Sequence, residues 1–208
     1  MITSIPIEAV EQQLLQQLSS FFFLSKKDSL LISEKMGGVV SRCEYCFSHT
    51  KNKYYACGGE TYFNPYQSAQ YTIFLYFFAN TISQDTDNRL LADKLYYLNK
   101  IMNGCDLYHE VNLPNYFTLD HPVGSVMGRA EYGEGFNFSQ NCTVGNNRGI
   151  YPYIGQNVYM CANSSIIGNC HIGNNVIIGA NSGVKDEDIP DDCMVFGYSP
   201  NLIIKRKK

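Results

Sequence analysis

Several features that would place the protein in a special class are missing from its sequence. No stretch reaches the ~18 uninterrupted apolar residues that a membrane-spanning helix needs, so we expect no membrane span. The formal net charge is −3, which argues against a nucleic-acid partner. The N-terminus lacks the basic segment, apolar stretch and small-residue cleavage site of a secretory signal, so we expect a cytoplasmic protein.

The eight cysteines do not indicate a disulfide scaffold, because the chain is not a small secreted protein. Cys43, Cys46, His49 and Cys57 are zinc-type ligands, but their spacing is irregular and the first pair falls on an expected helix. We therefore interpret them as buried or incidental thiols and expect no metal. The terminal run Lys205-Arg206-Lys207-Lys208 is expected to be a solvated, frayed end.

Residues 1–105 are predicted to form a helical domain. Amphipathic patterns predict helices over residues 7–24, 29–47, 66–82 and 88–102, the second of them broken by Gly37-Gly38. The aromatic residues of the third helix recur at helical spacing. We expect them to form core and oligomer contacts.

Residues 106–208 follow a six-residue period instead. Large apolar residues open the hexads, small or β-branched residues fill most fifth positions, and Asn fills the fourth position of each complete hexad. The opening residues are Phe138, Val144, Ile154, Met160, Ile166, Ile172, Ile178 and Val184. The fourth-position residues are Asn141, Asn147, Asn157, Asn163, Asn169, Asn175 and Asn181. Such a fixed period predicts a solenoid, here a left-handed parallel β-helix.

The hexad pattern has a physical cause. A triangular coil needs one inward apolar side chain on each side and a tight corner between sides. The corner requires a left-handed backbone conformation, which costs most L-residues ~1–2 kcal/mol and which Asn and Gly tolerate best. Upstream of Phe138 the register slips by one residue, and we expect a bulge between His121 and Val126 to absorb the slip.

The start of this half resembles the serine acetyltransferase family. Asp106-Leu107 and Asp120-His121-Pro122-Val123-Gly124 match that family's Asp-Ile-His and Asp-His-Ala-Thr-Gly segments. Further segments match in order up to about residue 204, among them Ile178-Gly179-Ala180 and Val184-Lys185-Asp186. The resemblance implies an α+β fold, with a helical N-terminal domain followed by a left-handed β-helix that binds acetyl-CoA.

In that family the histidine is the general base and an aspartate fifteen residues earlier orients it, which implies these roles for His121 and Asp106. An imidazole in hydrogen-bond reach removes the acceptor hydroxyl's proton as it attacks the thioester, and a carboxylate fixes the tautomer. His109, near Asp106, is the alternative base. Asp120, Tyr151 and Arg148 are expected to bind the acceptor.

The resemblance also implies that acetyl-CoA lies in a groove between adjacent subunits of a homotrimer, with a dimer of trimers as a further possibility. Small residues let the pantetheine arm run close to the backbone, and the matching positions are Ala162, Gly179 and Ala180. Lys185 or the terminal basic cluster would contact phosphates.

The sequence departs from the family where the acceptor carboxylate is held. The family's Arg-His pair is replaced by Ile150-Tyr151, and its Arg-Asp-Pro-Ala segment is absent. An amino acid needs its carboxylate neutralised, whereas Tyr151 and Tyr153 suit a sugar face. L-serine and a sugar hydroxyl of a surface polysaccharide therefore both remain as acceptors. N-acetylation of an amino sugar and a non-catalytic scaffold are weaker alternatives.

Overall fold

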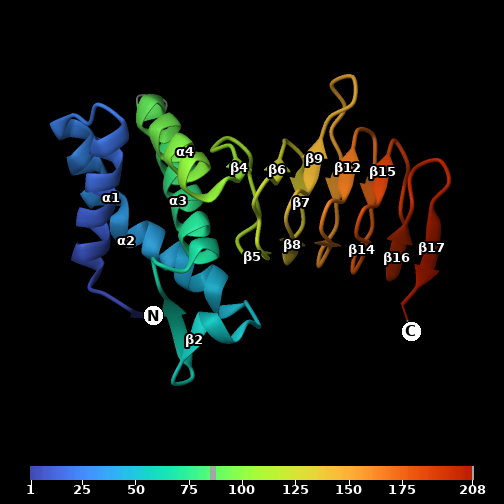
Figure 1. The fold of residues 1–208 in the computed structure, drawn as a ribbon, viewed down its shortest axis with the longest axis horizontal. Coiled ribbons are helices and arrows are strands. Elements are labelled where there is room, and N and C mark those ends of the chain that lie inside the picture. The colour runs from blue at the N-terminus through green and yellow to red at the C-terminus, as the bar shows by residue number, and fades with distance from the viewer. Residues whose placement is uncertain (85–87, 208) are drawn as a thin grey trace. The chain divides into compact units, whose positions relative to one another are not determined.

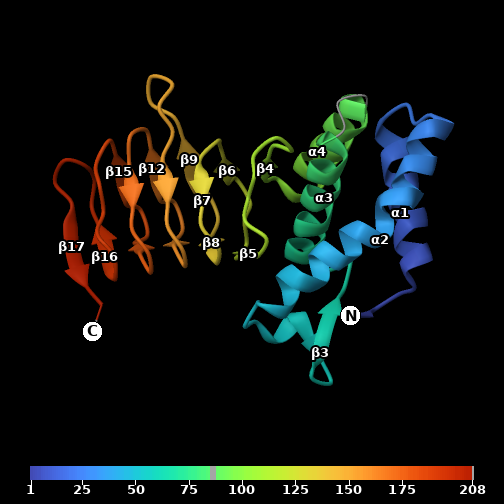
Figure 2. The same cartoon turned by 180° about the vertical axis from the view of Figure 1, so that it is seen from behind.

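The computed structural model describes residues 1–84 and 88–207. The chain divides into two compact units: Met1–Asn103 with Tyr108–Glu110, and Gly104–Leu107 with Val111–Lys208. Four helices and a small sheet form the first unit, and coils of parallel strands form the second (Figures 1 and 2). The predicted fold class, a helical domain followed by a left-handed parallel β-helix, is confirmed. In the described residues no helix is long and apolar enough to cross a membrane.

The helical unit contains α1 (Ile7–Phe21), α2 (Lys26–Ser48), α3 (Ser68–Ser83) and α4 (Arg89–Asn103). A short helix η1 (Lys53–Tyr55) precedes a sheet of β1 (Ile2–Thr3), β3 (Glu60–Phe63) and β2 (Ala56–Cys57). Helix α3 is buried along almost its whole length, so its aromatic residues form the core of this unit.

The predicted break at Gly37-Gly38 is wrong, because α2 runs through both glycines. Ser25 caps its start in a reciprocal pair of hydrogen bonds with Asp28. The helix buries Ile32, Met36 and other apolar residues on both sides of the glycines. Each such burial contributes ~1.5–3 kcal/mol, more than the ~1 kcal/mol that a helical glycine costs.

The β-helix has three sheets, which we call first, second and third. The first contains β4 (Asp106–Leu107), β6 (Val126–Met127), β9 (Thr143–Gly145), β12 (Ser165–Ile167) and β15 (Gly183–Lys185). The second contains β7 (Glu131–Tyr132), β10 (Tyr153–Ile154) and β13 (His171–Ile172). The third contains β5 (Phe117–Leu119), β8 (Phe136–Phe138), β11 (Tyr159–Met160), β14 (Ile177–Ile178), β16 (Cys193–Phe196) and β17 (Ile203–Arg206).

The hexad register is confirmed by burial. All eight hexad-opening residues point into the coils and are at most 1% exposed. The small residues at the fifth positions, such as Cys142 and Ser164, are buried as well. One inward apolar residue on each side of each coil therefore builds the core of the β-helix.

Five of the seven predicted corner asparagines turn corners with positive φ: Asn141, Asn157, Asn163, Asn175 and Asn181. Their amides form ladders between coils, for example Asn141 Nδ2 donating to Asn163 Oδ1 at 3.0 Å. The prediction is wrong for Asn147 and Asn169, which do not take positive φ. Gly168 (φ 83°) and Asp186 (φ 52°) turn the corner between the first and second sheets instead.

The C-terminal segment is not frayed as predicted, because Ile203–Arg206 forms β17. This strand pairs antiparallel with β16, the last parallel strand of the third sheet. An uncovered strand edge presents unpaired N–H and C=O groups, and β17 satisfies those of β16. Lys208 lies outside the described residues.

Candidate active site

A bulge at one corner of the β-helix carries His121. The corner between the third and first sheets is turned by Gly124, Asn141, Asn163 and Asn181, all with positive φ. The backbone N–H groups of Asn141, Asn163 and Asn181 each donate to a carbonyl in the preceding coil, that of the residue just before the corner residue there. Asn141, for example, donates to the Val123 carbonyl at 3.0 Å. We call this corner the His121 edge.

The bulge consists of two extra residues. Leu119 pairs in register with Phe138. Five residues lead from Leu119 to Gly124, whereas three lead from Phe138 to Asn141, so the earlier coil is longer by two. The extra length forms a tight turn in which Val123 N–H donates to the His121 carbonyl at 2.8 Å. A bulge is thus present as predicted, but it lies between Leu119 and Gly124 and adds two residues, where we expected one between His121 and Val126.

The bulge projects His121 into solvent. The residue itself is left-handed (φ 52°), and its side chain is 89% exposed. The ring atom Nε2 lies 3.7 Å from Asp120 Oδ1. Buried Ser125 fixes the end of the bulge, because its Oγ donates to the Ser139 carbonyl and accepts from the Cys142 N–H. An exposed imidazole on a firmly held turn is accessible to an acceptor.

Asp106 lies on the adjacent coil. Its N–H donates to the Ser125 carbonyl at 2.8 Å, and the Gly124 N–H donates to the Gly104 carbonyl at 2.8 Å. Leu107 points inward, so Asp106 faces outward from the first sheet, next to the bulge. The backbone thus brings Asp106 close to the His121 turn, while the side-chain contact of His121 is with Asp120.

Three of the predicted acetyl-CoA residues, Ala162, Gly179 and Ala180, lie further along the same corner. Ala162 and Ala180 directly precede the corner residues Asn163 and Asn181, and Ala180 is exposed. Gly179 is buried beneath the Phe196 ring, where a Cβ would lie 2.7 Å from Cδ1. Lys185 is exposed at the end of β15. Ala162 and Ala180 therefore leave this part of the His121 edge without bulky side chains, whereas Gly179 is covered by a ring.

Arg148 and Tyr151 lie on a hairpin between β9 and β10, which stands out from the coils in Figure 1. Asn147 and Ile150 exchange both backbone hydrogen bonds at 3.0 Å. Arg148 (φ 51°) and Gly149 (φ 81°) form the two-residue turn between them, as the primed hairpin turns require. The hairpin leaves the first sheet on the side opposite the His121 edge, so one chain alone does not bring Tyr151 to His121.

Asp186 anchors the hairpin. Its Oδ2 accepts from Asn147 Nδ2 at 2.6 Å, and its Oδ1 accepts from the Asn169 N–H at 2.9 Å. These hydrogen bonds, followed by the charges of Lys185 and Arg148, lower the pKa of the Asp186 carboxyl below its usual range.

Comparisons with known proteins agree with this architecture. Residues 151–186 match the family described as bacterial transferase hexapeptide (six repeats). The serine acetyltransferase of Synechococcus elongatus is 32% identical over 117 residues, 54% of this chain and 47% of that protein. This chain therefore spans about half the length of that relative.

Solved structures extend the likeness to the helices. Neisseria gonorrhoeae serine acetyltransferase superposes with a TM-score of 0.71 at 24% identity, over 92% of this chain and 78% of that one. Its complex with serine gives a TM-score of 0.66 at 26% identity, over 87% and 78%. The chain thus carries bacterial transferase hexapeptide repeats and is similar to serine acetyltransferases in sequence and fold.

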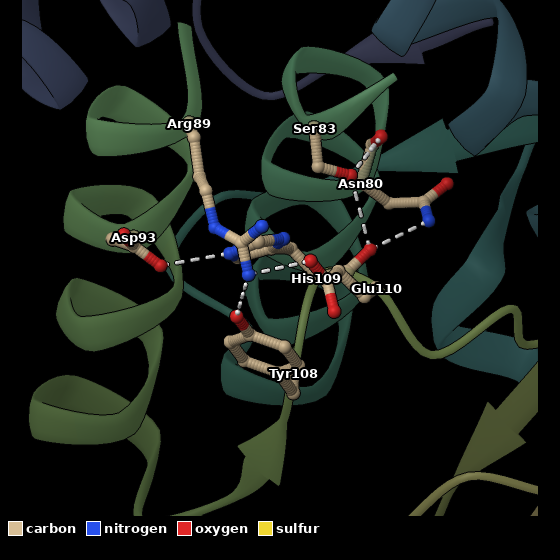
Figure 3. A network of polar contacts seen from close by, with 7 residues as sticks. All are labelled: Asn80, Ser83, Arg89, Asp93, Tyr108, His109 and Glu110. Carbon is tan, nitrogen blue, oxygen red and sulfur yellow. Dashed lines mark hydrogen bonds and ion pairs between the residues drawn. The ribbon is translucent and has the colours of Figure 1, made fainter. Parts of the chain in front are cut away.

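His109, which the sequence offered as the alternative base, is buried in the helical unit (Figure 3). Its side chain is 0% exposed, and Nε2 lies 2.9 Å from Asp93 Oδ1. Its carbonyl accepts from Asn80 Nδ2 and Ser83 Oγ. Arg89 ties down the flanking residues through an ion pair with Glu110 at 2.7 Å. These contacts hold the segment in place and keep His109 away from any acceptor.

The four zinc-type ligands do not come together. Cys43 and Cys46 are buried in α2, where burial raises the pKa of the Cys43 thiol, whereas Cys57 is exposed. His49 Nδ1 lies 2.8 Å from the Tyr45 carbonyl. No group of three or more metal-ligating residues occurs within residues 1–84 and 88–207.

Sequence reasoning missed several residues that shape the site. Gly124 turns the corner, Ser125 fixes the bulge, and Asp186 holds the hairpin. Ser125 could have been found, because it precedes Val126, the register partner of Thr143, as the small residue Cys142 precedes Thr143 in the next coil. No local signal marks Asp186, because it lies 39 residues from Asn147.

Proposed function

We propose that the chain is an acetyl-CoA-dependent O-acetyltransferase acting on the hydroxyl of L-serine or a related small molecule. The observation that supports this proposal most strongly is the two-residue bulge, which projects an exposed His121 from a corner that Ala162 and Ala180 line further on. The likeness to serine acetyltransferases supports the reaction and the acceptor.

In this proposal His121 is the general base. Its neutral imidazole takes the hydroxyl proton as the hydroxyl oxygen forms a bond to the acetyl carbonyl carbon. Asp106, one coil away, orients the ring and stabilises the imidazolium, while Asp120 contacts the acceptor. The C–S bond then breaks, and the imidazolium returns its proton to the thiolate of CoA. No covalent acyl-enzyme is needed.

A homotrimer would complete the site. Arg148 and Tyr151 border the first sheet on the side away from His121, so a neighbouring copy is needed to bring the two sets together. A trimer has a mass of about 70 kDa, three times 23.5 kDa, which light scattering measures directly. A dimer of trimers would double that mass.

The test is release of the CoA thiol from acetyl-CoA in the presence of L-serine. His121→Ala should lower kcat/KM by ~10²–10⁴, the usual contribution of a general base. Asp106→Asn should lower kcat with little change in KM. His171→Ala is the matched control, because His171 is an exposed histidine on the second sheet. Full activity of His121→Ala would refute the proposed mechanism.

A sugar hydroxyl is the second candidate acceptor, favoured by the hairpin. Ile150 is 50% and Tyr151 44% exposed, where the family resemblance calls for Arg and His, and nearby Tyr153 is 42% exposed. Such aromatic surface suits a sugar ring better than a carboxylate. Comparing the turnover of nucleotide-linked sugars with the turnover of L-serine decides between the two acceptors. Amino sugars are included in the comparison to detect N-acetylation. A chain that binds no acetyl-CoA would instead be a scaffold.

A further inference from the structure

The last corner of the His121 edge carries two aromatic rings. Phe196 and Tyr198 flank Gly197, whose φ is 84°. The Phe196 ring covers Gly179, and the Tyr198 ring covers Gly183, where a Cβ would lie 2.8 Å from the Tyr198 Cδ1. The glycines therefore make room for the rings. Tyr198 nevertheless remains 62% exposed, so one side of it packs on the coil and another is open.

Tyr198 also ends the row of outward positions that Asp106 begins. Strand register aligns Asp106 with Val126, then Thr143, Ser165 and Gly183, and a bridge adds Tyr198. Parallel strands lie ~4.8 Å apart, so the five steps place Tyr198 roughly 24 Å from Asp106. Small side chains occupy most of the row between them. An extended pantetheine arm with its pyrophosphate covers a span of this order.

Cations accompany the aromatic end of the row. Lys205 Nζ lies 5.8 Å from the centre of the Phe196 ring. The Lys185 N–H donates to Ser199 Oγ at 3.0 Å, which fixes the residue after Tyr198. A surface depression of about 450 Å³ beside it is lined by Lys185, Asp186, Glu187, Ser199 and Pro200. The Asp186 carboxylate there already accepts two hydrogen bonds, and Glu187 is only part-exposed.

We propose that Tyr198 is the stacking platform for the adenine base of coenzyme A, with Lys185 and Lys205 beside it for the phosphates. The proposal rests on the proposed function, because it takes His121 as the thioester end of the same ligand. An aromatic face binds a base without reading its edge, which suits a substrate whose reacting group lies far away. Tyr198 would then contribute affinity for the nucleotide and play no part in the chemistry.

The test compares the binding of two probes, CoA and pantetheine. Pantetheine shares the thiol arm of CoA and lacks its nucleotide. Calorimetry gives both dissociation constants for the wild-type chain, Tyr198→Ala and Tyr198→Phe. Tyr198→Ala should weaken the affinity for CoA roughly 5- to 150-fold, the range that stacking supplies, and leave the affinity for pantetheine unchanged. Tyr198→Phe should bind CoA like the wild type. Tyr66→Ala is the matched control, because Tyr66 is a tyrosine of the helical unit that is 68% exposed and lies outside the proposed site.

A second readout keeps the test independent of folding defects. Etheno-CoA, whose modified adenine is fluorescent, should be quenched on binding to the wild type and to Tyr198→Phe, and less so at saturation on Tyr198→Ala. Equal loss of CoA and pantetheine affinity, or unchanged CoA affinity in Tyr198→Ala, would overturn the inference alone. Absence of any CoA binding by the wild-type chain would instead overturn the proposed function, and this inference with it.

Discussion

Replacing Asn175 by alanine tests why the corners of the β-helix are built from asparagine. Asn175 has φ 57°; its side chain accepts from Asn157 Nδ2 at 3.1 Å and donates to Asp192 Oδ1 at 3.0 Å. Alanine loses both hydrogen bonds, at ~0.5–1 kcal/mol each because the site is exposed. It must also hold a left-handed conformation, at a further ~1 kcal/mol. We expect a loss of about 2–3 kcal/mol in the free energy of unfolding.

Glycine at the same position separates the two causes. Asn175→Gly loses the same hydrogen bonds but holds positive φ without strain, so it should be about 1 kcal/mol more stable than the alanine variant. Urea unfolding followed by the β-sheet signal in circular dichroism measures both, with the transition of the β-helix fitted separately if the two units unfold apart.

Asn169→Ala is the matched control, because Asn169 is an exposed asparagine at the same hexad position without positive φ. It should change the free energy of unfolding by less than ~0.5 kcal/mol. If Asn169→Ala cost as much as Asn175→Ala, or if the glycine variant were no better than alanine, the explanation by backbone conformation would be refuted.

Three further predictions concern other parts of the chain. Gly133→Ala should destabilise the β-helix by several kcal/mol in a thermal melt, because the added Cβ would lie 2.5 Å from the Gly155 backbone. Gly38→Ala should stabilise the helical unit by ~1 kcal/mol, because an added Cβ there meets nothing within 4 Å. The pKa of Asp186 is lowered in the fold, so its ionised form stabilises the fold above its usual pKa of 3.8, and this is lost as pH falls through the folded pKa. Asp186→Asn should therefore flatten the acid end of the curve of melting temperature against pH, and an unchanged curve would contradict this. In native protein a thiol reagent should modify exposed Cys57 quickly and buried Cys43 only after unfolding, as mass spectrometry of labelled peptides would show.

The features that the sequence predicted are those that depend on local repetition. Each hexad needs the same inward residue, so Ile166 or Ile178 could be placed in the core without knowledge of the rest of the chain. The bulge was also predictable, because a slip in a regular period has to be absorbed somewhere. The helices were found for the same reason, as in α1, where Val10, Leu14 and Leu18 recur every four residues on its buried side.

The features that were mispredicted or missed depend on contacts between distant residues. Gly37 and Gly38 looked like a break, yet packing on both sides keeps α2 continuous. Asn147 looked like a corner residue but serves as the partner of Asp186, which a six-residue period cannot reveal. The described part of the terminal basic run is solvated as expected, but the run looked frayed because the open edge of β16 is visible only once the coils are stacked.

Because the coils stack regularly, the length of the β-helix can be changed by one coil at a time. The bulge belongs to an early coil and Tyr198 to the last, so an extra eighteen-residue coil inserted between β12 and β15 would leave both ends intact. It would move them apart by ~4.8 Å. Under the proposed function, such an insertion would change the length of donor that fits without altering the residues proposed to meet either end of it.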